Sequence, residues 1–189
     1  MLDLPEKIIV FDTEYTAWEG SLQREWSGPN EYREVVQIGA VFVETEEFVE
    51  LNSFNVFVRP KKNPTLSEYF VTLTGITQEI IHKQAIDFPL ALRRLYEWSN
   101  SYDIYSFDKD DADVLRENCR LSGIDFPFED SRFFDIREIF LKAGIPVEQY
   151  SSGSIVEAFG KAITRRPHNA LNDARTIVDG LRELSKRNV

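Results

Sequence analysis

The sequence is poor in cysteine, in histidine and in long hydrophobic runs. Cys119 is the only cysteine among 189 residues, and there are two histidines. An internal disulfide is therefore excluded, and a structural zinc site has too few ligands. No stretch approaches the roughly 20 consecutive apolar residues of a membrane-spanning helix, and residues 1–6 lack the basic and apolar regions of a secretory signal. We expect no membrane partner and a cytoplasmic location.

Positive charge is also scarce. Twenty-two Lys and Arg residues stand against 32 Asp and Glu, which gives a formal net charge of −10. Proteins that bind duplex nucleic acid usually carry a basic face that releases counterions from phosphates. The composition therefore argues against that class, unless carboxylates hold divalent cations that meet the phosphate themselves. The short basic run Lys161, Arg165 and Arg166 is either a local phosphate contact or a solvated helix end.

The strongest pattern that is present is a pair of carboxylates at the end of an apolar run. Asp12 and Glu14 follow residues 8–11, Ile-Ile-Val-Phe. Side chains alternate along a strand with period two, so a strand places both carboxylates on one face, close enough to share a cation. His168, five positions before Asp173, lies near the other end of the chain. Carboxylates gathered from distant segments repel one another unless divalent cations lie between them, which indicates a phosphate-processing centre.

The hydrophobic pattern predicts one α/β domain over residues 1–189. Apolar, β-branched segments come first and amphipathic helices follow, and 42% of the residues are hydrophobic, enough for one sizeable core. Strands are predicted at residues 7–14, 35–43, 53–58, 103–107 and 132–135, the first three as an antiparallel meander. Helices are predicted at residues 88–99, 111–122, 154–161 and 170–186, with a short one after residues 73–77.

Three helix starts show capping residues. Asn169 is a plausible N-cap for the last helix, which puts Asp173 about one turn inside it and His168 on the preceding loop. Ser154 with Glu157, and Asp135 with Glu138, have the spacing of a capping box. We therefore expect a structural role for Asp135.

Two regions leave alternatives open. Asp108, Asp110, Asp111 and Asp113 compete for one place in the acidic site, and Asp111 would lie at a strand-to-helix junction, where sites commonly occur. The irregular segment 15–34 is rich in aromatic residues directly after the first carboxylate pair. Such side chains can stack a nucleic-acid base, although they more often attach a loop to the core.

Together these motifs resemble those of the DEDDh 3′-5′ exonucleases, a group that includes ribonuclease T, oligoribonuclease and polymerase proofreading subunits. The matching segments are Phe-Asp-Thr-Glu at 11–14, Asp111 in the frame Asp-x-x-Val-Leu, and His168 with Asp173 in the frame His-x-x-x-x-Asp. Leu-Thr-Gly-Ile at 73–76 and Arg-Pro-His at 166–168 are similar to the exoribonuclease branch that trims small and structured RNA ends, and to its bacterial relatives. The resemblance spans nearly the whole chain and implies a ribonuclease H-like mixed five-stranded sheet flanked by helices.

The resemblance also implies the residues that carry out the reaction. Asp12, Glu14, Asp111 and Asp173 would hold two divalent cations, Mg²⁺ or Mn²⁺, with Asp12 bridging them. His168 would accept a proton from the attacking water. Asp111 is preferred over Asp108 because the residues after it then fall where that branch has its helix contacts.

The substrate that the resemblance implies is a single-stranded nucleic acid, with RNA favoured over DNA. Hydrolysis from a free 3′ end would release nucleoside 5′-monophosphates. The alternation along the first strand also assigns Thr13 and Tyr15 to packing on the opposite face. Five residues are candidate substrate contacts: Thr13, Tyr15, Trp18, Leu73 and Arg166.

Two other functions remain open. A non-catalytic nucleic-acid-binding or scaffold module could keep this fold, because fold alone does not establish activity; the complete acidic set argues against it. A phosphodiesterase of very short oligonucleotides fits the net charge of −10 better, because a short ligand needs little basic surface. Weak salt dependence of the activity would favour the short ligand.

Overall fold

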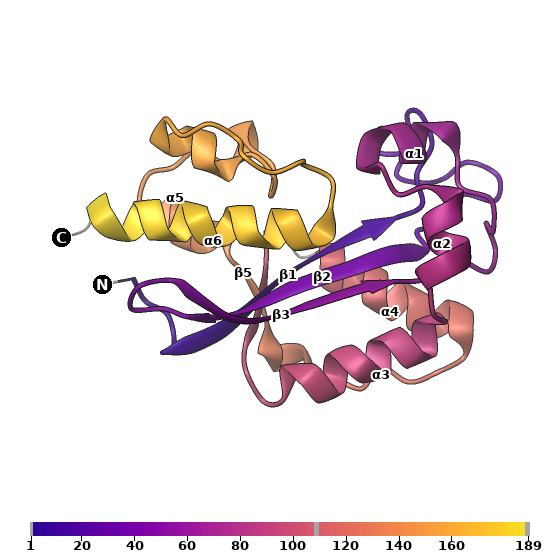
Figure 1. Cartoon of the computed structure of the whole chain (residues 1–189), viewed down its shortest axis with the longest axis horizontal. Coiled ribbons are helices and arrows are strands. Elements are labelled where there is room, and N and C mark those ends of the chain that lie inside the picture. Colours follow the sequence, from indigo (N-terminus) through magenta and orange to yellow (C-terminus); the bar gives the residue numbers. More distant parts are fainter. Residues whose placement is uncertain (1, 108–109, 188–189) are drawn as a thin grey trace.

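Five strands form one mixed sheet. The computed structural model describes residues 2–107 and 110–187, and the strands lie in the order β3-β2-β1-β4-β5 (Figure 1). All five predicted strands are present and the predicted fold class is confirmed, although β3 begins four residues earlier than expected. The strands are β1 Lys7–Tyr15, β2 Val35–Glu44, β3 Val49–Phe57, β4 Ile104–Ser106 and β5 Phe133–Asp135.

The directions of the strands decide where the two halves of the sequence meet. β1 pairs with β2 and β2 with β3 in antiparallel fashion, which confirms the predicted meander. β4 runs parallel to β1, and β5 runs parallel to β4. The carboxyl ends of β1, β4 and β5 therefore lie at one edge of the sheet, where open α/β sheets place their ligands.

Helices cover both faces of the sheet, and their predicted positions are largely confirmed. The described part of the chain contains α1 Glu68–Thr74, α2 Gln78–Gln84, α3 Phe88–Ser99, α4 Asp110–Ser122, α5 Arg137–Lys142 and α6 Ala170–Arg187, with 3₁₀ segments η1 Asp130–Arg132, η2 Val147–Gln149 and η3 Ile155–Phe159. In Figure 1, α6 crosses one face of the sheet, whereas α3 and α4 lie on the other. None of the helices described is long and apolar enough to cross a membrane.

Two predicted capping pairs are wrong. The expected helix 154–161 is the short 3₁₀ segment η3, and the Ser154 hydroxyl bonds backward, accepting from the Ser151 N–H at 2.9 Å. The segment ends at Gly160, which has the left-handed φ of 71°. Asp135 accepts hydrogen bonds from the backbone and guanidinium of Arg137 rather than pairing with Glu138. Asp135 thus makes a structural contact, although with Arg137 and not in the predicted capping pair.

Strand β1 divides the core between the two faces. Val10 packs in a cluster with Ile177 and other residues of α6. Phe11 packs in a second cluster with Leu95 of α3 and other residues of the opposite layer. Burial of each such side chain stabilises the fold by about 1.5–3 kcal/mol. Since the alternation continues to the end of the strand, Asp12 and Glu14 face α6, and Thr13 faces α4.

Candidate active site

The first part of the site forms where β1 ends beside the start of α6. Asp12, Glu14 and Asp173 are all buried. Asn169 caps α6 as predicted, because its side-chain oxygen accepts from the Asn172 N–H at 3.2 Å. The His168 N–H donates to Asp173 Oδ2 at 3.0 Å. Cap and hydrogen bond together fix the conformation of the motif from residue 168 to residue 173, which lies beside Glu14 of β1.

Three of these side chains can reach a single cation. Ligand atoms of Glu14, His168 and Asp173 all lie within 4.8 Å of one another. Asp173 Oδ1 is buried and accepts no hydrogen bond from the residues that the structure describes. A buried carboxylate oxygen without a donor costs free energy, and a hard divalent cation is a suitable partner for it. The donor set therefore fits a metal ion.

Burial and mutual repulsion shift the acidity of the site. The pKa of Asp12 is raised well above its ordinary value by burial and then by the charges of Asp111, Asp173 and Glu14. The pKa of Glu14 is raised in the same way. Burial raises the pKa of Asp173 to about 7, against the lowering effect of the His168 N–H and the Ser152 side chain. A cation or a proton must therefore compensate the cluster at neutral pH.

The pKa of His168 is lowered, whereas the pKa values of the carboxylates are raised. Burial and the neighbouring positive charge of Arg166 lower the pKa of His168 below its ordinary value. Its backbone has a φ of 58°, which is uncommon outside glycine. The imidazole is therefore neutral at pH 7, and a neutral imidazole can accept a proton.

Asp111 comes to the cluster from the other face of the sheet. It is buried near the start of α4, and its Oδ1 accepts from the Thr13 N–H at 2.8 Å and from Thr13 Oγ1 at 2.5 Å. The competing Asp113 pairs instead with Arg116 at 2.8 Å. Asp110 is exposed and lines the cavity that lies next to these carboxylates. Asp108 lies outside the described residues. Asp111 is thus the aspartate of the second segment that the structure buries beside β1.

A cavity of about 410 Å³ opens above the carboxylates. Four of the predicted substrate contacts line it: Thr13, Tyr15, Trp18 and Leu73. Tyr69 also lines it and could have been found from the sequence, because it precedes Leu73 by four positions and shares its helix face. Ser152 lines it as well, without a signal in the sequence. Glycine at the neighbouring position 153 leaves room for Asp173, because a Cβ there would lie 2.7 Å from Asp173 Oδ1.

Arg166 has a different environment from these four residues. Its Nη2 donates to the Thr72 carbonyl at 3.3 Å, and its guanidinium covers Gly75, where a Cβ would lie 2.4 Å from Nη1. Gly75 ends α1 with a φ of 75°. Arg166 therefore attaches the end of α1 to the loop that carries His168. A contact between Arg166 and substrate stays a prediction.

Comparison with known proteins identifies the family. The exonuclease model named RNase_T matches residues 9–181, most of the chain. The chain belongs to this exonuclease family. The resemblance seen in the three motifs is thereby confirmed. Members of the DEDDh family use divalent metal ions, and the cluster of Glu14, His168 and Asp173 fits such an ion.

Individual members of the exonuclease family match at moderate identity. The chain is 30% identical over 183 residues to the 3′-5′ exoribonuclease 1 of Mus musculus, covering 90% of this chain and 50% of the mouse protein. It thus spans about half the length of that relative. It is 29% identical to the "Probable 3′-5′ exonuclease KapD" of Bacillus subtilis (strain 168), covering 89% of this chain and 80% of KapD.

A solved structure shows the same fold. The nuclease domain of 3′hExo, described as a DEDDh family member bound to rAMP, superposes with a TM-score of 0.82 at 24% identity. The match covers 98% of this chain and 95% of that domain. The ribonuclease H-like architecture expected from the motifs is therefore present in this exonuclease-family chain.

Proposed function

We propose that this chain is a metal-dependent 3′-5′ exonuclease that acts on single-stranded nucleic acid, RNA in preference to DNA, and releases nucleoside 5′-monophosphates. The observation that carries the proposal is the convergence of buried carboxylates from β1, α4 and α6 with one histidine at one edge of the sheet. Membership of the exonuclease family and the names of the relatives support it.

We assign four carboxylates to the metal ions: Asp12, Glu14, Asp111 and Asp173. Two divalent cations held there, Mg²⁺ or Mn²⁺, would supply an activated water and neutralise the leaving oxygen. His168 accepts the proton of the attacking water, because its lowered pKa keeps it neutral. Thr13 holds Asp111 in place through two hydrogen bonds.

The catalytic cavity has a suitable size for one terminal nucleotide. Its volume of about 410 Å³ lies at the small end of ordinary ligand pockets. Trp18, Tyr69 and Leu73 supply an apolar lining against which a base can pack. The preference for RNA follows the exoribonuclease named among the relatives.

Two further expectations from the sequence stay predictions. They are a single exonuclease domain over residues 1–189 and a cytoplasmic location.

The direct test is degradation of 5′-labelled single-stranded RNA and DNA of matched sequence in Mg²⁺, Mn²⁺ or EDTA. We expect a metal-dependent ladder that shortens from the 3′ end and is lost in His168→Ala and Asp12→Ala. Arg93→Ala, on the exposed face of α3, is the matched control and should retain full activity. Absence of cleavage with every metal would contradict the exonuclease.

A second candidate is a phosphodiesterase of very short oligonucleotides, favoured by the net charge of −10. It predicts hydrolysis of dimers and trimers without hydrolysis of longer strands, and weak dependence on salt. Binding without hydrolysis of any length would instead indicate a nucleic-acid-binding module.

A further inference from the structure

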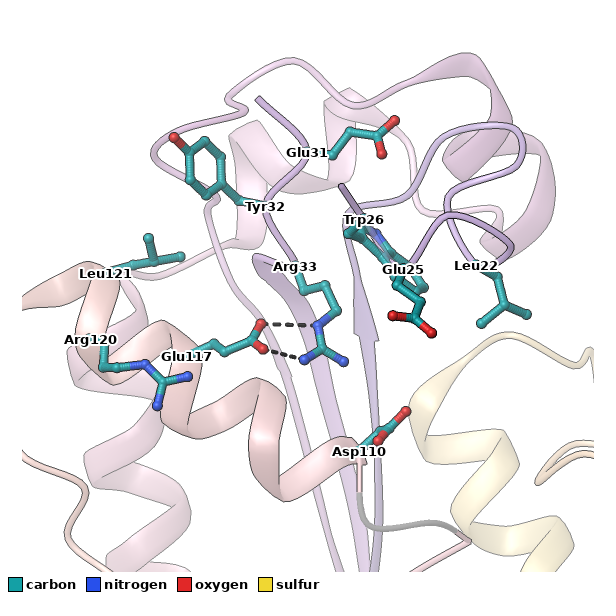
Figure 2. Close-up of a pocket in the computed structure, with 10 residues that line it drawn as sticks. All are labelled: Leu22, Glu25, Trp26, Glu31, Tyr32, Arg33, Asp110, Glu117, Arg120 and Leu121. Atoms are coloured by element: carbon teal, nitrogen blue, oxygen red, sulfur yellow. Dashed lines mark hydrogen bonds and ion pairs between the residues drawn. The ribbon is translucent and has the colours of Figure 1, made fainter. Parts of the chain in front are cut away.

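A second and larger cavity lies beside the catalytic one. It has a volume of about 860 Å³ and lies between the segment 15–34 and α4 (Figure 2). We call it the outer pocket and define it by Trp26, Tyr32, Arg33, Glu117, Arg120 and Leu121. Leu22, Trp26 and Asp110 line both cavities. The outer pocket therefore adjoins the proposed site of hydrolysis.

Trp26 is held firmly at the junction of the two cavities. Its indole N–H donates to the Thr16 carbonyl at 2.9 Å, and its ring centroid lies 5.4 Å from that of Tyr15. The guanidinium of Arg33 lies 5.9 Å from the same ring. Trp26 and Glu25 have positive φ values of 51° and 52°, an uncommon conformation that recurs at ligand-binding sites. The loop thus fixes one aromatic wall of the outer pocket.

Two of the four carboxylates that line the outer pocket, Glu31 and Glu117, are paired with arginines, and Glu25 and Asp110 are the other two. Arg33 Nε donates to Glu117 Oε2 at 3.0 Å, as Figure 2 shows, and Arg24 Nε donates to Glu31 Oε2 at 2.9 Å. Arg120 lies exposed in the last turn of α4 and adds a positive charge to the rim. The lining combines aromatic faces with arginine, as single-strand binding sites do, without a continuous basic track.

We propose that the outer pocket binds the two nucleotides immediately 5′ of the one that is hydrolysed. This inference rests on the proposed exonuclease function. The outer pocket has about twice the volume of the catalytic cavity, 860 against 410 Å³, which leaves room for more than one nucleotide. Trp26 and Tyr32 pack against the bases, and Arg120 contacts a phosphate. Because the chain has a net charge of −10 and attracts phosphates weakly, nucleotides further upstream add little.

The experiment compares substrates that fill one or both cavities. The p-nitrophenyl ester of a nucleoside 5′-monophosphate fills the catalytic cavity, whereas oligonucleotides of two, three, four, six and twelve residues extend outward. We expect kcat/KM to rise up to the trimer and then to level off. In Tyr32→Ala and Arg120→Ala, the ratio of kcat/KM for the trimer to kcat/KM for the ester should fall about five- to tenfold. Arg120→Lys should recover part of the loss, and the control Arg93→Ala should keep the wild-type ratio.

The outcomes separate this inference from the function on which it rests. Hydrolysis of the ester and of every oligonucleotide with equal kcat/KM would contradict the proposed role of the outer pocket in binding, but would leave the proposed exonuclease function standing. An unchanged trimer-to-ester ratio in both Tyr32→Ala and Arg120→Ala would do the same. A kcat/KM that continues to rise from four to twelve nucleotides would contradict the short binding site. Failure to hydrolyse any substrate in Mg²⁺ or Mn²⁺ would overturn both.

Discussion

The side-chain oxygen of Gln37 accepts a hydrogen bond of 3.0 Å from the backbone N–H of Ala170. Gln37 is fully buried in β2, and Ala170 begins α6, three residues before Asp173. The Gln37 amide nitrogen donates to Asn55 at 2.8 Å, which fixes the orientation of the amide. One internal side chain thus joins the sheet to the start of α6, which carries Asp173 and directly follows the loop of His168.

Gln37→Met removes the acceptor and keeps the length of the side chain. The Ala170 N–H then loses its side-chain partner in a buried environment, and we expect a loss of about 1–3 kcal/mol in the free energy of unfolding, measured by urea denaturation. Asn55→Ala, which removes the exposed partner on β3, is the control and should cost less. If both variants lost the same free energy of unfolding, the hydrogen bond from Ala170 to Gln37 would contribute no more to stability than the bond between Gln37 and Asn55.

Gly39→Ala tests how closely α6 approaches β2. A Cβ at Gly39 would lie 2.1 Å from the Leu171 nitrogen and 2.3 Å from the Ala170 carbonyl carbon, so backbone must move. We expect a loss of about 1–3 kcal/mol or more in stability, together with lower kcat at temperatures where the variant is folded, because α6 carries Asp173. Thermal unfolding and steady-state kinetics on the same preparation separate the two effects. Wild-type values of both would show that α6 adjusts without cost.

Thr13→Val removes one hydrogen bond from Asp111 and keeps the shape of the side chain. The backbone N–H of residue 13 still reaches Asp111, but the hydroxyl donor is lost. Removal of a partner that orients a metal ligand typically weakens metal affinity 10- to 100-fold, so the Mg²⁺ concentration for half-maximal activity should rise by that factor. Thr13→Ser keeps the hydroxyl and should resemble the wild type. A Mg²⁺ titration of Thr13→Val that overlays the wild-type curve would refute this role.

The raised pKa of Asp173 predicts how pH affects the metal-free protein. The folded-state pKa of about 7 exceeds the ordinary value of 3.8, so between these values the folded state binds more protons than the unfolded state. The contribution of Asp173 to the free energy of unfolding is therefore fully present below about pH 4 and is lost as the pH rises through 7. Between these values the free energy of unfolding falls by roughly 1.4 kcal/mol per pH unit for one proton. Burial raises the pKa of Asp12 and Glu14 in the same direction.

Denaturant unfolding in EDTA at pH 5, 6, 7 and 8 measures this effect. Asp173→Asn removes one titrating group, so its stability should fall less steeply with pH than that of the wild type. Saturating Mg²⁺ should reverse the trend, because deprotonated carboxylates bind the metal more tightly. Parallel pH profiles of the wild type and Asp173→Asn in EDTA would contradict the buried, proton-binding carboxylate.

The choice of Asp111 shows where sequence reasoning needs the structure. Four aspartates occur between residues 108 and 113, and helix periodicity alone left them as competitors. Packing decides among those described, because α4 buries Asp111 against Thr13 while Asp113 turns toward Arg116. The two wrong capping pairs have a similar cause, since Ser154 and Asp135 found closer partners than the residue three positions ahead.

The sequence by itself determined the elements of the sheet, the carboxylate pair of β1 and the Asn169 cap of α6, because alternation and capping depend on neighbours within one turn or strand. Only the tertiary structure decided that Gln37 and Gly39 hold α6 in place, that Ser152 lines the catalytic cavity, and that segment 15–34 builds an outer pocket with α4. These contacts join residues far apart in the chain, and local patterns carry no information on which distant surfaces pack together.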